Sequence, residues 1–565
     1  MHFQDMEYRR PPLDATVRQI RDLTERMRQA ESYAQARKVF LESEAFFRRL
    51  DTLSELVNIR HCINTRDTFY NAETSFWSAA APVIGDYRHQ FADAICGSAF
   101  RPEFEAEYGL LMFRNFELQK HTFDSRITEE LRRENNLMRE YESLIAGGSV
   151  LFEGRSHTLP GMMAFKTLPD DKRRWNAWQA DGAWFRAHSA QIDRIFSELV
   201  DVRDTMGKKL GYENYLPLGY ARRCRNCYTE ADVDRYRALV RTYIVPIAER
   251  ICREKAARNG VAYPLSYADD ALSDRTGNPI PVGGQQGILD TTARFYRSLS
   301  EEAGSFFKMM LDNGLMDIPS RAGKAGGGYC ACFPTYKVPF IFTNFNGTQE
   351  DVKLIAHESG HAFEVYLNRE RVPFAQIWAT GEACEINSTA MEFLAESYAE
   401  EYFGKDAAKY RRSHLEETII HIPYGAAIDH FQHICYRNPN YTAEQRHVVW
   451  REMTQMYTPW LRLDGGIPFY AEGMRWQAQR HLFVGPLYYL DYSLAETVSL
   501  EIWAKMRSSF ADAFRAYMAY TVLGGSDTFL GLLSCAGFAN PFEEETIQRL
   551  ATALKDGLRT LEWHQ

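Results

Sequence analysis

Apolar residues recur at three- and four-residue steps along most of this chain, and the positions between them are rich in Arg, Glu and Gln. The pattern is clear over residues 14–28 and 33–47. Turn-forming Gly and Pro residues separate the periodic stretches, for example at 159–161 and 217–219. The first 250 residues or so are therefore expected to form long antiparallel helices, and the fold class to be mainly α.

The composition changes to Gly, Pro, Ser and Asn over residues 258–350, where we expect a transition between two parts of the chain, 1–257 and 258–565. Within this region, residues 336–346 alternate like a β-strand. Pro339 has no N–H to donate to a central ladder, so we expect this strand to lie at a sheet edge or to start at the proline. A free edge can accept an extended peptide.

Residues 357–361 read His-Glu-Ser-Gly-His inside a helix predicted over 351–368. A four-residue step places His357 and His361 on one helix face, where both imidazoles can bind one Zn²⁺. Glu358 then lies beside the metal and can handle the proton of a water molecule. About 0.03 such matches are expected by chance in a chain of this composition. The alternative is a helix that carries two ordinary surface histidines.

A catalytic zinc site needs a third protein ligand, and no third histidine follows at the metzincin spacing. A carboxylate must therefore serve. The next stretch with helical character, residues 381–400, offers several glutamates, and their spacing alone does not choose among them: Glu382, Glu385, Glu392, Glu396 and Glu400.

Several segments resemble, in order and spacing, those of the M3 metallopeptidases, and most closely their oligoendopeptidase F branch. These segments are 323–330, 340–344, 351–352, 357–361 and 385–392.

The resemblance implies a large helical peptidase of the zincin type, with a small sheet beside the H-E-x-x-H helix and a deep substrate cleft. It also implies one Zn²⁺ per chain, held by His357, His361 and Glu385. Residues 1–257 would form one wall of the cleft, and residues 258–565 would form the catalytic part.

In that family a histidine and several tyrosines in a late helical segment hold the substrate carbonyl and stabilise the oxyanion. Residues 464–470, followed by His481 and then Tyr488, Tyr489 and Tyr492, are similar to that segment. The distance from the histidine to the tyrosines is one residue shorter than in longer members. The division of roles among the three tyrosines therefore stays open.

Charge and composition exclude other classes. Lys and Arg number 66 and Asp and Glu 75, a net charge of −9, which is opposite to the basic surplus of a nucleic-acid-binding protein. The longest apolar run, 528–539, is too short to cross a membrane. The first residues lack a secretory signal, so we expect a cytoplasmic protein with reduced cysteines.

His421, His430 and His433 could mimic a second metal site, but ordinary core or surface roles are favoured.

The sequence therefore predicts a zinc-dependent oligoendopeptidase that cleaves internal bonds of short unstructured peptides. One alternative is a dipeptidyl-carboxypeptidase-like exopeptidase, in which Arg475 or Arg480 would bind the C-terminal carboxylate. The other is a catalytically silent helical peptide-binding protein, which would have no need for Glu358.

Overall fold

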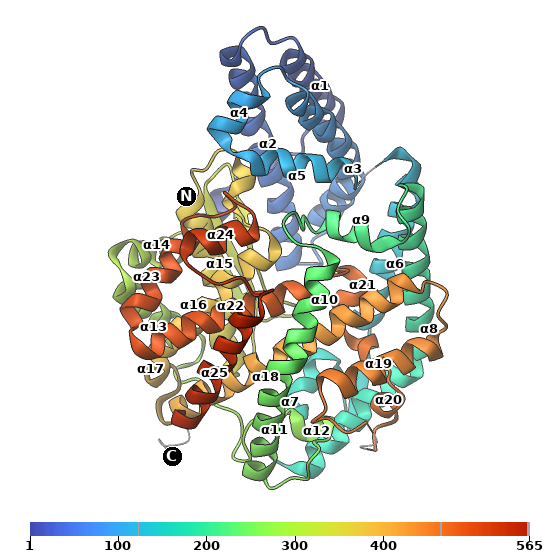
Figure 1. The fold of residues 1–565 in the computed structure, drawn as a ribbon, viewed down its shortest axis with the longest axis vertical. Coiled ribbons are helices and arrows are strands. Elements are labelled where there is room, and N and C mark those ends of the chain that lie inside the picture. The colour runs from blue at the N-terminus through green and yellow to red at the C-terminus, as the bar shows by residue number, and fades with distance from the viewer. Residues whose placement is uncertain (123, 464–465, 562–565) are drawn as a thin grey trace. The chain divides into compact units, whose positions relative to one another are not determined.

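The computed structural model describes residues 1–122, 124–463 and 466–561, and most of these residues are helical, as Figure 1 shows. The chain forms two compact units, each built from three separate segments. Unit 1 comprises residues 1–120, 280–407 and 499–539, and unit 2 comprises residues 121–279, 408–498 and 540–565. The expected fold class, mainly α with a small sheet, is confirmed.

Neither unit follows the boundary expected between residues 257 and 258, because residues 1–120 group with the segment that carries the H-E-x-x-H motif. The assignment of different functional roles to residues 1–257 and 258–565 stays a prediction. Among the described helices, none is both long enough and apolar enough to cross a membrane.

The helices of unit 1 are α1 (Leu13–Arg28), α2 (Tyr33–Ile63), α3 (Thr68–Cys96), α4 (Arg101–Tyr108), α5 (Leu110–Lys120), α13 (Gly284–Leu299), α14 (Glu301–Asp312), α15 (Gln349–Asn368), α16 (Gly381–Ala395), α17 (Ala399–Phe403), α23 (Phe510–Thr521) and α24 (Phe529–Ala536). The apolar faces of α1, α2 and α3 form a common core that includes Ile20, Phe40 and Phe91. The helical periodicity of the sequence thus reports the buried faces of these helices.

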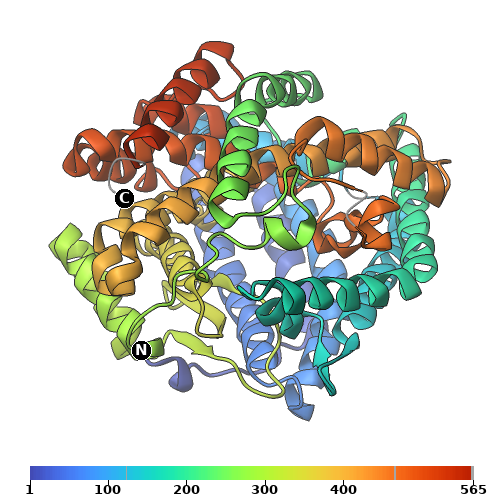
Figure 2. The same ribbon diagram turned by 90° about the horizontal axis from the view of Figure 1, so that it is seen from below.

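Unit 1 also contains a three-stranded sheet in the order β3 (Met316–Pro319), β5 (Val338–Phe345), β4 (Tyr329–Phe333). Strand β5 pairs with β3 in parallel and with β4 in antiparallel orientation. The N-terminal segment packs against this sheet: the Phe3 ring lies 4.4 Å from that of Phe340, and Figure 2 shows the N-terminus beside this part of the chain.

The expectation that residues 336–346 form an edge strand is wrong, because β5 is the middle strand. Pro339 is tolerated for two reasons. It pairs with Cys332 of β4, and its missing N–H makes that pair a non-hydrogen-bonded one. On the other side, β3 pairs with β5 only from Ile341 onward, so β3 has no carbonyl group that would need an N–H from Pro339. The edge strand next to β5 is β4.

Two local features position α15. The Asp351 carboxylate accepts hydrogen bonds from the backbone N–H groups of Asn346, Gly347 and Thr348, which caps the start of the helix. Gly360 allows α16 to approach closely, since a Cβ there would lie 2.5 Å from the Asn387 carbonyl oxygen. The helix predicted over 351–368 is confirmed by α15.

The elements of unit 2 are α6 (Thr128–Ala146), β1 (Ser149–Phe152), β2 (Arg155–Thr158), α7 (Met163–Lys166), α8 (Asp171–Lys209), α9 (Tyr215–Arg222), α10 (Glu230–Leu239), α11 (Val245–Asn259), α12 (Tyr267–Asp270), α19 (Ala443–Tyr457), α20 (Pro468–Ala471), α21 (Arg480–Val484) and α25 (Glu544–Leu561), together with most of α18 (Ala407–Arg437) and the first half of α22 (Tyr489–Ser508). Strands β1 and β2 form a hairpin. Buried charges link the helices: Arg203 of α8 donates to Glu134 of α6 at 2.7 Å.

Candidate functional site

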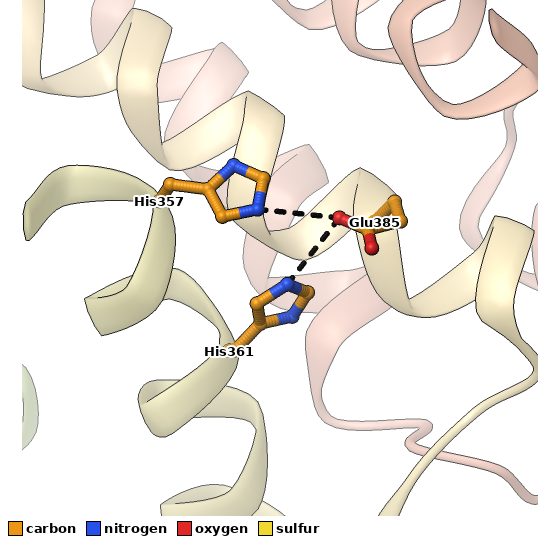
Figure 3. Close-up of side chains that lie close together, drawn as sticks. All are labelled: His357, His361 and Glu385. Atoms are coloured by element: carbon orange, nitrogen blue, oxygen red, sulfur yellow. Dashed lines mark ion pairs between the residues drawn. The ribbon is translucent and has the colours of Figure 1, made fainter. Parts of the chain in front are cut away.

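Helices α15 and α16 of unit 1 bring three potential metal ligands together, as Figure 3 shows. His357 and His361 lie one turn apart on α15, and Glu385 lies on α16. The Oε2 atom of Glu385 is 3.3 Å from the Nε2 atom of each histidine. A tetrahedral zinc with bonds of about 2.0–2.2 Å places its ligand atoms roughly 3.4 Å apart. These donor atoms therefore have the spacing and the chemistry that Zn²⁺ requires.

The geometry distinguishes among the glutamates that spacing alone left open. Within the described residues, Glu385 is the one glutamate of α16 whose oxygen groups with both imidazoles as a potential ligand set. Glu392, two turns further along the same helix, instead faces the other nitrogen of His357, with its Oε1 atom 2.7 Å from Nδ1. Glu382 is buried near the start of α16.

Both histidines have a partner at Nδ1. Glu392 holds the Nδ1 proton of His357, which leaves Nε2 as the ligand atom. For His361 the partner is a thiol, since Cys384 Sγ lies 3.2 Å from Nδ1. The sequence does not single out Cys384, because His361, which it contacts, lies on the preceding helix.

Glu358 is 4% exposed, and its Oε2 atom has no hydrogen-bond partner among the described residues. Burial raises the pKa of Glu358, and the two histidines beside it oppose that rise. A buried carboxylate oxygen without a hydrogen-bond partner costs folding free energy unless another group interacts with it. A metal with its water molecule supplies that group, so the residues present fit a catalytic zinc.

Electrostatics couples the proposed ligands. Burial by itself would raise the pKa of Glu385, but the adjacent imidazoles outweigh it and hold the pKa well below its usual range. Burial likewise disfavours a charged His357, but hydrogen bonds to Glu385 and Glu392 raise the pKa of His357 well above its usual value.

With this geometry in place, comparison with known proteins decides the family. The model of the M3 peptidase N-terminal domain matches residues 3–123, and the model of peptidase family M3 matches residues 294–552. PZ peptidase A, solved with an inhibitor, is 34% identical, with 99% of each chain covered and a TM-score of 0.95. The chain belongs to the M3 peptidase family.

Other members of the M3 family give the same result. A solved protein provisionally named oligoendopeptidase F is 36% identical, with 99% of each chain covered and a TM-score of 0.94. The oligoendopeptidase F homolog of Borreliella burgdorferi is 23% identical over 263 residues, which are 44% of this chain and 43% of that relative. This match thus spans less than half the curated relative's length. The resemblance inferred from the sequence motifs is confirmed.

The aromatic residues expected to assist catalysis lie together in unit 2. The His481 ring is 5.7 Å from Tyr488, 5.3 Å from Tyr489 and 5.9 Å from Tyr492. Tyr489 is buried, whereas Tyr488 carries the Arg223 guanidinium 4.3 Å above its ring. Asp464 and Gly465, the first residues of the similar 464–470 segment, lie outside the described residues.

His421 belongs to this aromatic group, although the sequence favoured an ordinary role for it. Its Nε2 atom is 2.8 Å from the Tyr489 hydroxyl, and its Nδ1 atom is 2.6 Å from Glu496 Oε1. Spacing could not reveal this contact, because the partners lie 68 and 75 residues away. His430 and His433 instead contact Tyr457 and Asp429.

The two arginines considered for an exopeptidase lie in unit 2 and differ in their partners. Arg480 forms a surface ion pair with Glu142. Arg475 is stacked on Tyr424, with its guanidinium carbon 5.8 Å from the ring centroid. The ion pair of Arg480 does not favour binding of a substrate carboxylate, whereas the buried Nη1 atom of Arg475 has no hydrogen-bond partner among the described residues.

Proposed function

We propose that this protein is a zinc-dependent oligoendopeptidase that hydrolyses internal bonds of short unstructured peptides. The observation that carries the proposal is the combination of an N, N, O donor set with a buried, unpartnered Glu358 oxygen beside it. A peptide-binding protein without activity has no use for that carboxylate. The ion pair of Arg480 with Glu142 argues against that residue as the carboxylate-binding group of an exopeptidase, and the end-blocked peptide described below tests the alternative that uses Arg475.

His357, His361 and Glu385 would hold the metal. When bound, Zn²⁺ polarises the scissile carbonyl and lowers the pKa of an attacking water molecule. Glu358 accepts the proton that the water loses on attack and then delivers it to the leaving amine. Burial suits Glu358 to this role, because burial raises the pKa of the carboxyl and so makes it a better proton acceptor.

Strand β4 would bind the peptide backbone. The pair of Cys332 with Pro339 is a non-hydrogen-bonded one, so the N–H and C=O groups of Cys332 point away from β5. Because antiparallel pairs alternate, those of Cys330 point the same way. An extended peptide can therefore add to this edge, and the role first expected of residues 336–346 passes to the neighbouring strand.

His481 and the tyrosines would donate hydrogen bonds to the oxyanion. The contacts of His421 distinguish the two candidate tyrosines. In the tautomer whose Nδ1–H donates to Glu496, the Nε2 atom of His421 accepts a hydrogen bond from the Tyr489 hydroxyl. That proton is then not available to substrate. We therefore assign the oxyanion to Tyr492, because the Tyr489 hydroxyl already has His421 as its partner.

The proposed function is tested with an internally quenched peptide blocked at both ends. Zinc-loaded protein should cleave it at an internal bond, identified by mass spectrometry, and a chelator should abolish cleavage until zinc is restored. Cleavage confined to peptides with a free C-terminus would instead support the exopeptidase alternative. Binding without cleavage would support the silent peptide-binding alternative.

A further inference from the structure

A cavity of about 450 Å³ lies within unit 1, between helix α2 and the outer edge of β4. Residues of β4 form one wall and a polar face of α2 forms the opposite wall. Apolar side chains after α15, namely Phe374, Ile377 and Trp378, also line it. The cavity therefore borders the strand edge to which a peptide would add.

The cavity reaches the proposed metal site. The Trp378 ring, in its wall, lies 6.1 Å from the ring of His361. Cys330, also in the wall, is half-buried; desolvation raises the pKa of its thiol, and the nearby Glu358 carboxylate raises it further. A side chain of a peptide bound along β4 can thus enter this cavity while a neighbouring bond lies near the metal.

The α2 wall presents two acidic residues, and they differ in their partners. Asp51 is already neutralised by Arg88, whose Nη1 atom lies 3.3 Å from its Oδ2 atom. Glu55 accepts only a neutral donor, with Asn58 Nδ2 at 3.0 Å from its Oε1 atom. Within the described residues, no Lys or Arg forms an ion pair with Glu55. Burial raises the pKa of Glu55, as expected for a partly desolvated carboxylate without a cation.

We propose that Glu55 binds the side chain of a Lys or Arg residue of the substrate, so that the enzyme selects peptides with a cation at one position relative to the cleaved bond. This inference rests on the proposed peptidase function. The apolar wall formed by Phe374, Ile377 and Trp378 suits the aliphatic stem of such a side chain, while the charged head meets the carboxylate. A peptide cation would give Glu55 the partner that the chain itself does not provide.

The test uses a series of end-blocked, internally quenched peptides with a single Arg moved step by step along a neutral sequence. Each Arg peptide is paired with one that carries citrulline, which has nearly the same shape and no charge. We expect kcat/KM to favour Arg by about tenfold or more at one position, as for a charge-assisted hydrogen bond in a partly buried site. The Glu55→Gln variant should reduce this ratio to less than about twofold.

Two further variants separate charge from folding. Glu42→Gln removes one negative charge from the same helix, where Glu42 pairs with Arg26 outside the cavity lining, and should keep the wild-type preference. Glu55→Lys should reverse the preference, so that a Glu peptide is cleaved better than its Gln counterpart at the same position. A folded Glu55→Gln variant that keeps the full Arg preference would overturn the proposal.

A binding measurement tests the role of Glu55 separately from catalysis. The Kd of each Arg and citrulline peptide is measured by fluorescence anisotropy with the zinc-loaded Glu358→Gln variant, with and without Glu55→Gln. Tighter binding of one Arg peptide that depends on Glu55 supports the inference even if hydrolysis fails. Hydrolysis of all peptides without any charge preference overturns the inference and leaves the peptidase function intact.

Discussion

Replacing Gly360 by Ala tests whether the close approach of α15 and α16 sets the geometry of the proposed metal site. A Cβ at this position would lie 2.5 Å from the Asn387 carbonyl oxygen and 2.8 Å from the Ser388 Cα, whereas ordinary contacts begin at 3.4 Å. Backbone atoms cannot rotate away, so the helices must separate locally by about 0.9 Å to move the closest pair from 2.5 Å to 3.4 Å. Metal–ligand distances tolerate only about 0.2 Å. The histidines on one helix and Glu385 on the other would therefore lose their common centre.

We expect Gly360→Ala to weaken zinc binding by at least about tenfold and to lower the free energy of unfolding by about 1–3 kcal/mol. Competition with a chromophoric chelator measures the first quantity, and thermal denaturation of the metal-free protein measures the second. Gly85→Ala is the matched control, since Gly85 also lies inside a helix but has nothing within 4 Å of its added Cβ. This control should bind zinc normally and gain up to about 1 kcal/mol of stability. Wild-type zinc affinity in Gly360→Ala would refute the reasoning.

Steady-state kinetics should show that Tyr492→Phe lowers kcat by about 10²- to 10³-fold with little change in KM. Tyr489→Phe should lower kcat much less, because its hydroxyl is held by His421, and equal losses in the two variants would contradict the role given to His421. Cys384→Val should weaken zinc binding more than Cys384→Ser, which keeps a polar partner for the zinc ligand beside it; equal affinities by chelator competition would contradict this. Burial raises the pKa of Glu44 from 4.5 to about 7, although a hydrogen bond from the Phe374 N–H acts in the opposite direction. The contribution of Glu44 to stability is therefore full below pH 4.5 and is lost as the pH rises through 7. Glu44→Gln should remove this loss, up to about 3 kcal/mol, and its melting temperature relative to wild type should rise between pH 5 and pH 8; a constant difference would contradict the assignment.

The H-E-x-x-H helix was predictable because its determinants are local. The four-residue step fixes the relative direction of the two imidazoles, and Asp351 caps the helix from within the same segment. The choice of Glu385 was not local. Several glutamates of the next stretch share its chemistry, and the family resemblance rather than their spacing singled it out.

The sheet shows where a correct local rule led to a wrong result. The rule that excludes proline from central strands assumes that both neighbours of a strand extend along its whole length, but β3 pairs with β5 only from Ile341 onward. Pro339 therefore occupies a position of the middle strand that has a neighbour on one side. The length and register of the neighbouring strands decide this, and the sequence of β5 does not contain that information.

The contacts of His421 and the cavity beside β4 depend on residues far apart in the sequence. His421 and Tyr489 come from different helices of unit 2, and Glu55 and Trp378 come from distant segments of unit 1. Each residue taken alone has an ordinary explanation, either a core histidine or a charged helix position. Their roles appear only when the fold brings the partners together.

The central claim is that Glu358 transfers protons at a zinc site whose metal is held by His357, His361 and Glu385. The most direct measurement compares the zinc content and the turnover of the Glu358→Gln variant with those of the wild type. The account predicts one zinc per chain in both proteins and a loss of kcat of about 10²- to 10⁴-fold in the variant. Wild-type turnover in a zinc-loaded Glu358→Gln protein would contradict it.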